Sequence, residues 1–114
     1  MFLGGINVTR FIEIYQIRDD INDKRDLSFM NFASITKLIG NIKRQLTNYY
    51  TKIYELEYES KDSVNDDTIL SELFYKFNME RPEDFRGHAM SVSDIVAIDD
   101  KLYFCDSYGW QDIE

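Results

Sequence analysis

Residues 95–105 of the chain have the sequence IVAIDDKLYFC, and this stretch decides the fold class. Two apolar runs, Ile95–Ile98 and Leu102–Cys105, lie on either side of a polar triplet at positions 99–101. Short runs rich in β-branched and aromatic residues that flank a polar turn are typical of a β-hairpin. We therefore expect an antiparallel hairpin close to the C-terminus, followed by a turn at Tyr108–Trp110.

Two segments nearer the N-terminus also have the pattern of strands. Thr9–Ile17 is rich in β-branched and aromatic residues, which favour strands over helices. Tyr49–Glu59 alternates with a period of two, as expected of a strand with one tyrosine-rich face. The alternation predicts that one face carries Tyr50, Lys52, Tyr54, Leu56 and Tyr58.

Apolar residues recur at helical spacing in the segments between these strands. The first helix is predicted over Phe32–Ile39, with Asn31 or Ser34 as its N-terminal cap and Gly40 at its end. A second short helix is predicted to continue through positions 42–46.

The clearest helical pattern lies in the C-terminal half, over Thr68–Asn78, where the apolar residues form a stripe. Its N-terminal cap is expected at Asp67 or Thr68. A short helical turn is predicted over Pro82–Gly87, because proline suits the first position of a helix and glycine its end.

Together these elements predict a single small α+β domain over residues 1–114. Its sheet is expected to be antiparallel or mixed, with about four strands, and to carry two to three helices. Polar loops are expected at Arg18–Asp26 and Ser60–Asp67, and residues 1–8 are expected to be flexible.

Composition excludes several classes of protein. The chain has 114 residues, of which 44% are hydrophobic and 30% charged, as in one folded domain with its own core. The single cysteine, Cys105, excludes an intramolecular disulfide and a zinc site built on several thiolates, and it favours a reducing, cytoplasmic compartment. Its apolar surroundings predict a buried, inert thiol. The apolar stretches are too short to span a membrane, and Met1–Val8 lacks the pattern of a signal peptide.

Charge is unevenly distributed along the chain. Thirteen Lys and Arg residues stand against 21 Asp and Glu residues, which gives a net charge of −8. Residues 1–57 carry eight basic and seven acidic residues, whereas residues 58–114 carry five basic and 14 acidic residues. An acidic surface repels nucleic-acid phosphates and attracts basic protein surfaces. We therefore expect no direct DNA binding, and the charge fits either plain solubility or a basic protein partner.

Two stretches of the C-terminal half form a longer motif. Residues 81–96 have the sequence RPEDFRGHAMSVSDIV, and residues 103–110 have the sequence YFCDSYGW. Together they resemble the signature of the YodL-like domain family of Firmicutes. In that family, a Pro-x-Asp-Phe-x-Gly-His-Ser segment leads through one hydrophobic residue into Ser-Val-Ser-Asp-Val-Val. A short hairpin follows, and it ends in Asp-Ser-aromatic-Gly-aromatic. Here Ala89, Ile95 and Trp110 replace the family's Ser, Val and Phe, and the N-terminal half fits the family more loosely.

The resemblance implies a small α+β domain carried by plasmids, conjugative elements and prophages, alone or within larger proteins. It brings no established catalytic site to this chain. The motif is therefore interpreted as a fold signature whose short polar side chains bond to nearby backbone. Its residues are Pro82, Phe85, Gly87, His88, Ser91, Ser93, Asp94, Asp106, Ser107 and Gly109.

His88 is the only histidine, and it offers the main alternative to a structural motif. With Ser91, Ser93 and Asp94 nearby it could form a Ser-His-Asp arrangement, or it could act with Asp94 or Asp106 in a small nuclease. The sequence lacks the Gly-x-Ser-x-Gly elbow, and it contains no P-loop, GxGxxG, HExxH or CxxC motif. We therefore expect no catalytic residues and no cofactor.

The charged residues raise two other kinds of site, a metal site and a surface that binds RNA. Asp19, Asp20 and Asp23 lack the spacing of a calcium-binding loop, so no metal site is expected. Basic residues between positions 37 and 52 lie near tyrosines and could hold single-stranded RNA, but no RNP or KH signature accompanies them. We therefore interpret them as an ordinary solvated helix face with core tyrosines.

These observations favour an interaction protein over an enzyme. The expected function is a small inhibitor, encoded by a mobile element and acting in the cytoplasm of a bacterial host. A looser resemblance to small anti-CRISPR proteins points to Cas9 or its guide RNA complex as the partner, because Cas9 holds an RNA–DNA duplex in a basic channel. The acidic residues expected to make this contact are Glu83, Asp84, Asp99 and Asp100.

Two alternatives stay open at this point. The first is a non-catalytic module that binds another host protein, such as a cytoskeletal one, through an apolar or tyrosine-rich patch and with little dependence on salt. The second is the small nuclease that uses His88. The chain is expected to be a monomer, or a dimer formed through an exposed hairpin edge.

Overall fold

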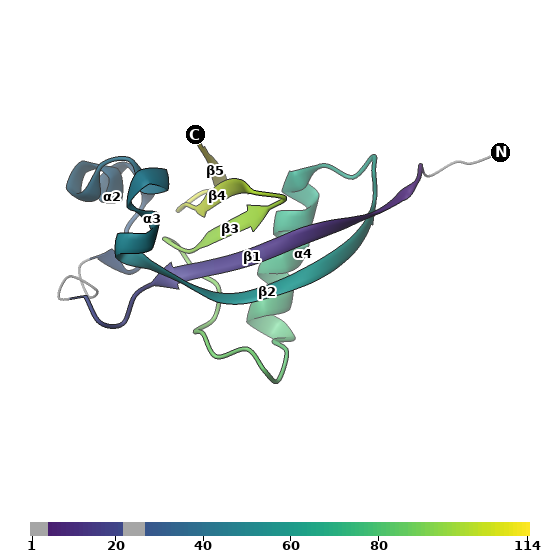
Figure 1. The fold of residues 1–114 in the computed structure, drawn as a ribbon, viewed down its shortest axis with the longest axis horizontal. Helices are drawn as coiled ribbons and strands as arrows, with labels where there is room; N and C mark the ends of the chain where they lie inside the picture. The colour runs from purple at the N-terminus through teal and green to yellow at the C-terminus, as the bar shows by residue number, and fades with distance from the viewer. Residues whose placement is uncertain (1–4, 22–26) are drawn as a thin grey trace.

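The computed structural model describes residues 5–21 and 27–114, which form five strands and three helices (Figure 1). In chain order the elements are β1 (Asn7–Ile17), α2 (Phe32–Ile39), α3 (Ile42–Tyr49), β2 (Tyr50–Lys61), α4 (Asp66–Met79), β3 (Ile95–Ile98), β4 (Lys101–Cys105) and β5 (Trp110–Ile113). The strands form one antiparallel sheet in the order β2-β1-β3-β4-β5. The predicted α+β class is confirmed, with one strand more than expected. β5 was missed because four residues with a polar middle carry no clear strand pattern.

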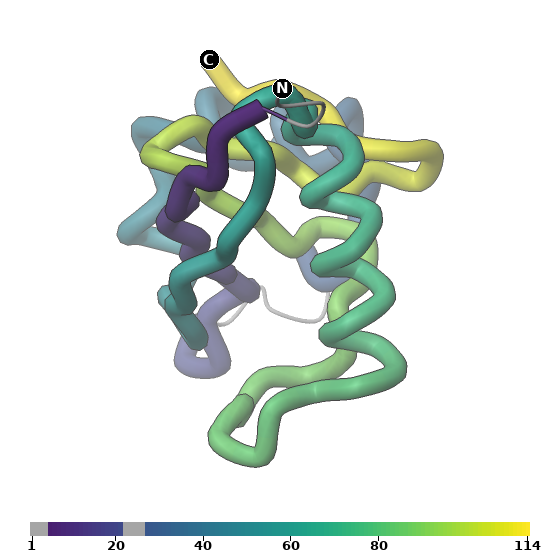
Figure 2. Tube along the Cα trace, turned by 90° about the vertical axis from the view of Figure 1, so that its right-hand side faces the viewer, coloured from purple at the N-terminus to yellow at the C-terminus, as the bar shows by residue number. Residues whose placement is uncertain are grey.

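The core has two parts, one on each face of the sheet. Helix α4 packs on one face, which we call the α4 face, and α2 and α3 pack on the other, the α2–α3 face. β3 contributes to both, with Val96 and Ile98 on the α4 face and Ile95 and Ala97 on the α2–α3 face. A strand covered on both faces is hydrophobic throughout, which explains the uninterrupted apolar run of β3. Figure 2 shows α4 standing along one side of the strands.

β1 and β2 form a long ribbon that runs along the longest dimension of the molecule, 56 Å (Figure 1). β1 begins two residues before the predicted Thr9, since Asn7 already pairs with Lys61. Of the segments predicted to be flexible or to form loops, residues 1–4 and 22–26 lie outside the described residues.

A β-bulge divides the tyrosine-rich face that the sequence predicts for β2. Opposite the Ile14–Tyr15 step, β2 holds the extra residue Ile53. Beyond it, Tyr54, Leu56 and Tyr58 pack on the α4 face, whereas Tyr50 is buried on the α2–α3 face. The single face predicted from Tyr50 to Tyr58 was wrong, because one extra residue reverses the alternation on one side of the bulge.

The helix ends show which cap predictions hold. Asn31 accepts a hydrogen bond from the third residue of α2, and Gly40 ends that helix, both as predicted. The cap of α4 is Asn65, whose side chain accepts from the Thr68 amide at 2.9 Å. The predicted cap at Asp67 or Thr68 was therefore wrong. Asp67 lies in the first turn of α4, where a carboxylate is stabilised by the helix dipole.

The segment Pro82–Gly87 contains a single turn, in which the Phe85 amide donates to the Pro82 carbonyl at 3.1 Å, and no helix follows. Gly87 is required by a close approach of side chains. A Cβ at this position would lie 2.3 Å from Cδ1 of Ile53 and 2.5 Å from Oε1 of Gln16. The glycine therefore lets this segment pack directly against β1 and β2.

The turn between β3 and β4 is held from outside the hairpin. Asp99 and Asp100 have φ angles of 49° and 72°, as required at the two central residues of the turn that best matches strand twist. The Asp99 carboxylate accepts from the Phe11 amide at 2.8 Å and pairs with Arg10, and the Phe11 amide is the main cause of its lowered pKa. Arg10 also binds Asp66 at 3.0 Å, so β1, this turn and the start of α4 meet at one point.

We expect Asp100→Gly to raise the free energy of unfolding by roughly 1 kcal/mol, because glycine adopts positive φ without the steric cost of a side chain. The Asp100 side chain has no hydrogen bond or ion pair with the described residues that the change would remove. Urea unfolding monitored by circular dichroism measures the effect. Asp99→Gly is the control, and it should destabilise because it removes the contacts to Phe11 and Arg10. A less stable Asp100→Gly protein would contradict the prediction.

Candidate functional site

A buried polar cluster forms where the C-terminal motif meets β1. Gln16 is 3% exposed, and its side-chain amide reaches two parts of the motif. Its Nε2 donates to the His88 carbonyl at 2.9 Å and to Oδ2 of Asp94 at 3.0 Å, while its Oε1 accepts from the His88 amide at 3.1 Å. Oδ2 of Asp94 also accepts from the Ser91 amide at 3.0 Å. These bonds hold the segment before β3 against β1.

Asp94 is the buried carboxyl of this cluster, with 1% of its surface exposed. Burial raises the pKa of Asp94 to about 7, although hydrogen bonds from the Ser91 amide and from Gln16 act in the opposite direction. Its second oxygen, Oδ1, has no hydrogen-bond partner among the described residues and lies 3.8 Å from Nε2 of His88. That distance is too long for a hydrogen bond, and the two groups form an ion pair only when His88 is protonated.

The hydroxyls of Ser91 and Ser93, the two motif serines near His88 in sequence, are hydrogen-bonded to backbone groups. Oγ of Ser93 accepts from the Phe29 amide at 3.1 Å, and Oγ of Ser91 donates to the Ala89 carbonyl at 3.3 Å. A serine nucleophile needs a hydrogen bond to its base, and neither hydroxyl is hydrogen-bonded to His88. The structure thus brings His88 and Asp94 together without assembling a Ser-His-Asp triad.

The far end of the motif is joined to α2 instead. Oδ1 of Asp106 accepts from the Phe32 amide at 3.1 Å, at the start of α2, and from the Ser107 amide at 2.9 Å. The Asp106 amide donates to the Gly109 carbonyl at 3.0 Å, and Gly109 has a φ of 71°. Backbone amides, and not His88, therefore engage the Asp106 carboxylate that the nuclease hypothesis uses.

Cys105 and the acidic residues are the remaining candidates for reactive or metal-binding groups. Cys105 is buried in β4 as predicted, and burial raises the pKa of its thiol to about 12, which leaves the thiol protonated and unreactive at neutral pH. Within residues 5–21 and 27–114, no group of three or more His, Cys, Asp or Glu side chains is placed to hold a metal ion. No helix in the same part of the chain is long and apolar enough to cross a membrane.

The four acidic residues predicted to bind a partner lie in two separate places. Asp99 and Asp100 form the β3–β4 turn, next to the N-terminal end of α4. Glu83 and Asp84 follow the opposite end of α4, where Asp84 accepts from the Tyr54 hydroxyl at 2.8 Å (Figure 1). With its 14 residues α4 is about 20 Å long, so the two pairs do not form one surface.

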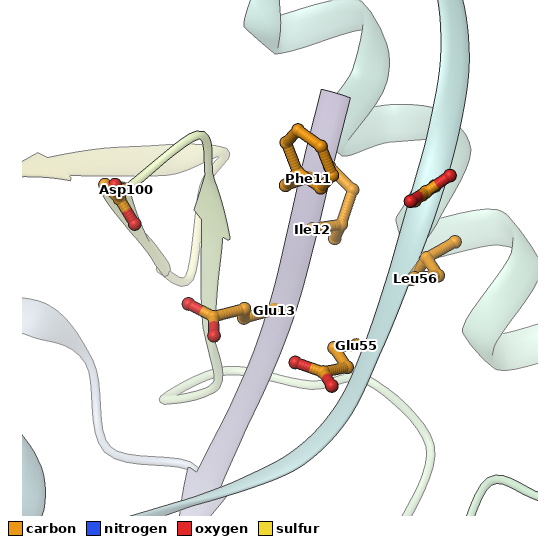
Figure 3. Close-up of a pocket in the computed structure, with 7 residues that line it drawn as sticks. Phe11, Ile12, Glu13, Glu55, Leu56 and Asp100 are labelled. Carbon is orange, nitrogen blue, oxygen red and sulfur yellow. The ribbon is translucent and has the colours of Figure 1, made fainter. Parts of the chain in front are cut away.

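Acidic side chains are concentrated instead on the exposed part of the α2–α3 face of the β1–β2 ribbon. Glu13 lies directly opposite Glu55 across the ribbon, and Phe11 lies opposite Glu57. With Asp100 from the β3–β4 turn they line an open pocket of about 420 Å³ (Figure 3). Phe11 is 59% exposed beside these carboxylates. We call these five residues the acidic pocket.

Among the described residues, one cationic side chain, that of Lys52, forms ion pairs with carboxylates of this pocket. Nζ of Lys52 lies 3.2 Å from Oε2 of Glu13 and 3.0 Å from Oε2 of Glu55. Glu57 and Asp100 have no ion-pair partner within the part of the chain that the structure describes. The pocket therefore holds four carboxylates against one ammonium group. The Lys52 ammonium group, one of the basic residues considered for RNA, is thus paired with two carboxylates.

The acidic pocket was missed from the sequence because charge was compared between the two halves of the chain. A usable signal was present, since Glu55, Glu57 and Glu59 alternate along a predicted strand and must share one face. The pairing of this row with Glu13 depends on the register of the ribbon, which the sequence pattern does not specify.

The fold and the site define a small α+β domain with a buried polar motif and an exposed acidic face. Residues 11–114 match the YodL-like domain family, and the chain belongs to that family. The resemblance carried by residues 81–96 and 103–110 is thereby confirmed. The YodL-like domain is not a known enzyme family. Neither a curated protein nor a solved structure matches the chain.

We expect Asp94 to make the protein less stable as pH rises from about 4 to about 7. Its pKa is higher in the folded chain than in the unfolded one, so over this range the folded state keeps a proton that the unfolded state releases, and stability falls with rising pH. Asp94→Asn should remove this contribution, leaving the variant more stable than the wild type above pH 7 by a few kcal/mol, on the order of 1.4 kcal/mol per pKa unit.

Urea unfolding of both proteins across this pH range gives the difference directly, so the contributions of all other titrating groups cancel. The gap between the two curves should widen from acid to neutral pH. Parallel curves, or a gap that narrows with rising pH, would show that Asp94 is not a destabilising buried carboxylate.

Proposed function

We propose that this domain is a non-catalytic interaction module that binds a basic region of a partner protein through the acidic pocket. The observation that carries the proposal is the pair Glu13 and Glu55 beside the exposed Phe11, with Glu57 and Asp100 around the same space. An open pocket with four carboxylates and a single ammonium group favours a cationic ligand.

The physical argument starts from repulsion within the free domain. Like charges directly opposite one another on neighbouring strands are destabilising, and Lys52 neutralises only part of the charge on Glu13 and Glu55. A Lys or Arg side chain of the partner would place its charged group among the carboxylates and its aliphatic stem against Phe11. The repulsion present in the free domain is then relieved in the complex.

Proteins that handle nucleic acid are the partner class that we put first. They hold phosphates in positively charged channels, as Cas9 does with its RNA–DNA duplex. A domain of 114 residues with a net charge of −8 can compete with guide RNA or target DNA for such a channel. In that role the domain is an inhibitor of a defence protein, an anti-CRISPR protein. The same charge repels free DNA.

The test is a binding measurement with purified Cas9, with and without guide RNA, at low and high salt. The wild-type domain should bind guide-free Cas9, and its affinity should fall as salt screens the charges. The triple variant E13Q/E55Q/E57Q should bind about tenfold more weakly at low salt, because it removes three of the four carboxylate charges of the acidic pocket.

The matched control, Glu83→Gln with Asp112→Asn and Glu114→Gln, removes three exposed acidic charges elsewhere and should bind like the wild type. Equal losses in both variants would mean that net charge matters and that the acidic pocket does not. If the wild-type domain did not bind Cas9 but bound another purified basic protein through Glu13, Glu55 and Glu57, Cas9 would be rejected as the partner. The proposal of an interaction module would stand.

An apolar surface supports a second candidate function. A groove of about 510 Å³ lies between α4 and the turn after β4, and Phe74 and Trp110 line it. Phe74 is 40% exposed. This groove fits a module for another host protein, such as a cytoskeletal one, bound through apolar contacts. Such binding should change little with salt and should weaken in Phe74→Ser.

A further inference from the structure

β2 is the longest strand of the sheet and one of its two edges. It pairs with β1 on one side, and no backbone hydrogen bond from another described segment reaches its opposite side between Thr51 and Ser60. After the bulge at Ile53, its pairing with β1 is regular from Tyr54 to Lys61. A long regular edge carries unpaired N–H and C=O groups that pair readily with another extended chain.

An open groove lies beside this edge on the α4 face. It has a volume of about 670 Å³ and is lined by Tyr58 of β2, by residues of α4 that include Tyr75 and Lys76, and by Glu80, which directly follows α4. Tyr75 is 58% exposed, so an accessible aromatic ring lines the groove on the α4 side. Figure 2 shows β2 and α4 next to each other along this part of the molecule. Every second side chain of a strand added to β2 would enter the groove.

The other side chains of an added strand would lie on the α2–α3 face. There, Glu55, Glu57 and Glu59 project from alternate positions of β2, and all three are exposed. Side chains directly opposite on neighbouring strands lie about 5 Å apart, and opposite charges at that distance stabilise the pairing. A row of three glutamates therefore matches a strand with Lys or Arg at every second position.

A second copy of this chain does not fit the same edge. Two β2 strands related by a two-fold axis would place both rows of glutamates, Glu55, Glu57 and Glu59, side by side on one face. Like charges in such positions are destabilising. The charge of the edge therefore selects a basic segment of a different protein over a dimer formed through β2.

We propose that β2 accepts an extended segment of the partner protein as an additional strand. Lys or Arg residues of that segment face Glu55, Glu57 and Glu59, and the apolar or aromatic residues between them enter the groove beside Tyr58 and Tyr75. The inference rests on the proposed function, to which it adds the conformation and the alternating basic and apolar pattern of the segment that is bound.

Two synthetic peptides of identical composition test this proposal with the full chain. In one, Lys alternates with Val; in the other, the lysines are grouped at one end, so net charge is equal and only the alternation differs. The alternating peptide should bind roughly tenfold more tightly in calorimetry. It should also slow amide hydrogen exchange in β2 between Tyr54 and Ser60, because the unpaired amides become hydrogen-bonded.

A pair of variants on α4 separates the groove from general charge. Tyr75→Ala should weaken binding of the alternating peptide about fivefold, because it removes an aromatic wall of the groove. Met79→Ala is the matched control, since Met79 is 70% exposed on the same helix and does not line the groove. It should leave the affinity for both peptides unchanged.

Equal affinities for the two peptides, with unchanged exchange in β2, would overturn strand addition. If the triple variant E13Q/E55Q/E57Q then still weakened both peptides, the acidic pocket would remain the binding site and only the further inference would fail. If neither peptide bound at low salt, the inference and the proposed function would both be rejected.

Discussion

Gln16 brings a primary amide into the interior of the protein, where its donor and acceptor atoms must find partners because water is absent. Those partners are the backbone of His88 and the carboxylate of Asp94. The bonds fix the segment before β3 against β1, so that β3 enters the sheet with Ile95 opposite Tyr15. β4 and β5 then follow by antiparallel pairing, and the C-terminal half is placed relative to the N-terminal half.

The contact of Gln16 with His88 and Asp94 gives a physical explanation for the spacing of the C-terminal motif. Gly87 lies where a side chain would displace the Gln16 amide, and the Asp94 backbone is paired with that of Cys105 in β4. The buried carboxyl of Asp94 lowers stability at neutral pH, so the motif retains a polar group that an apolar core would not need. The acidic pocket lies outside this cluster and shares no residue with it.

Local patterns were sufficient for much of the fold. The hairpin and the first two helices depend on short-range periodicity, capping and turn chemistry, and their approximate bounds were predictable. The bulge at Ile53 was not, because it exists only in the register between β1 and β2. The acidic pocket needed the same register together with the position of Asp100, which comes from a turn more than forty residues further along the chain. Sequence patterns predict which face of a strand or helix a residue occupies. The acidic pocket is formed by residues of β1, β2 and the β3–β4 turn, so no pattern within one of these elements predicts it.

The position of β1 between β2 and β3 in the sheet has a consequence for synthesis of the protein. β1 can pair with β2 as soon as residues up to Lys61 have been made. Its other edge pairs with β3, in which Ile98 lies opposite Ile12. On a nascent chain, this second edge of β1 therefore stays open until β3 has been made. Pairing across such a sequence distance is slow, and open edges favour association between chains. Truncated products that end before Ile95 keep that edge exposed and are natural clients for chaperones and proteases.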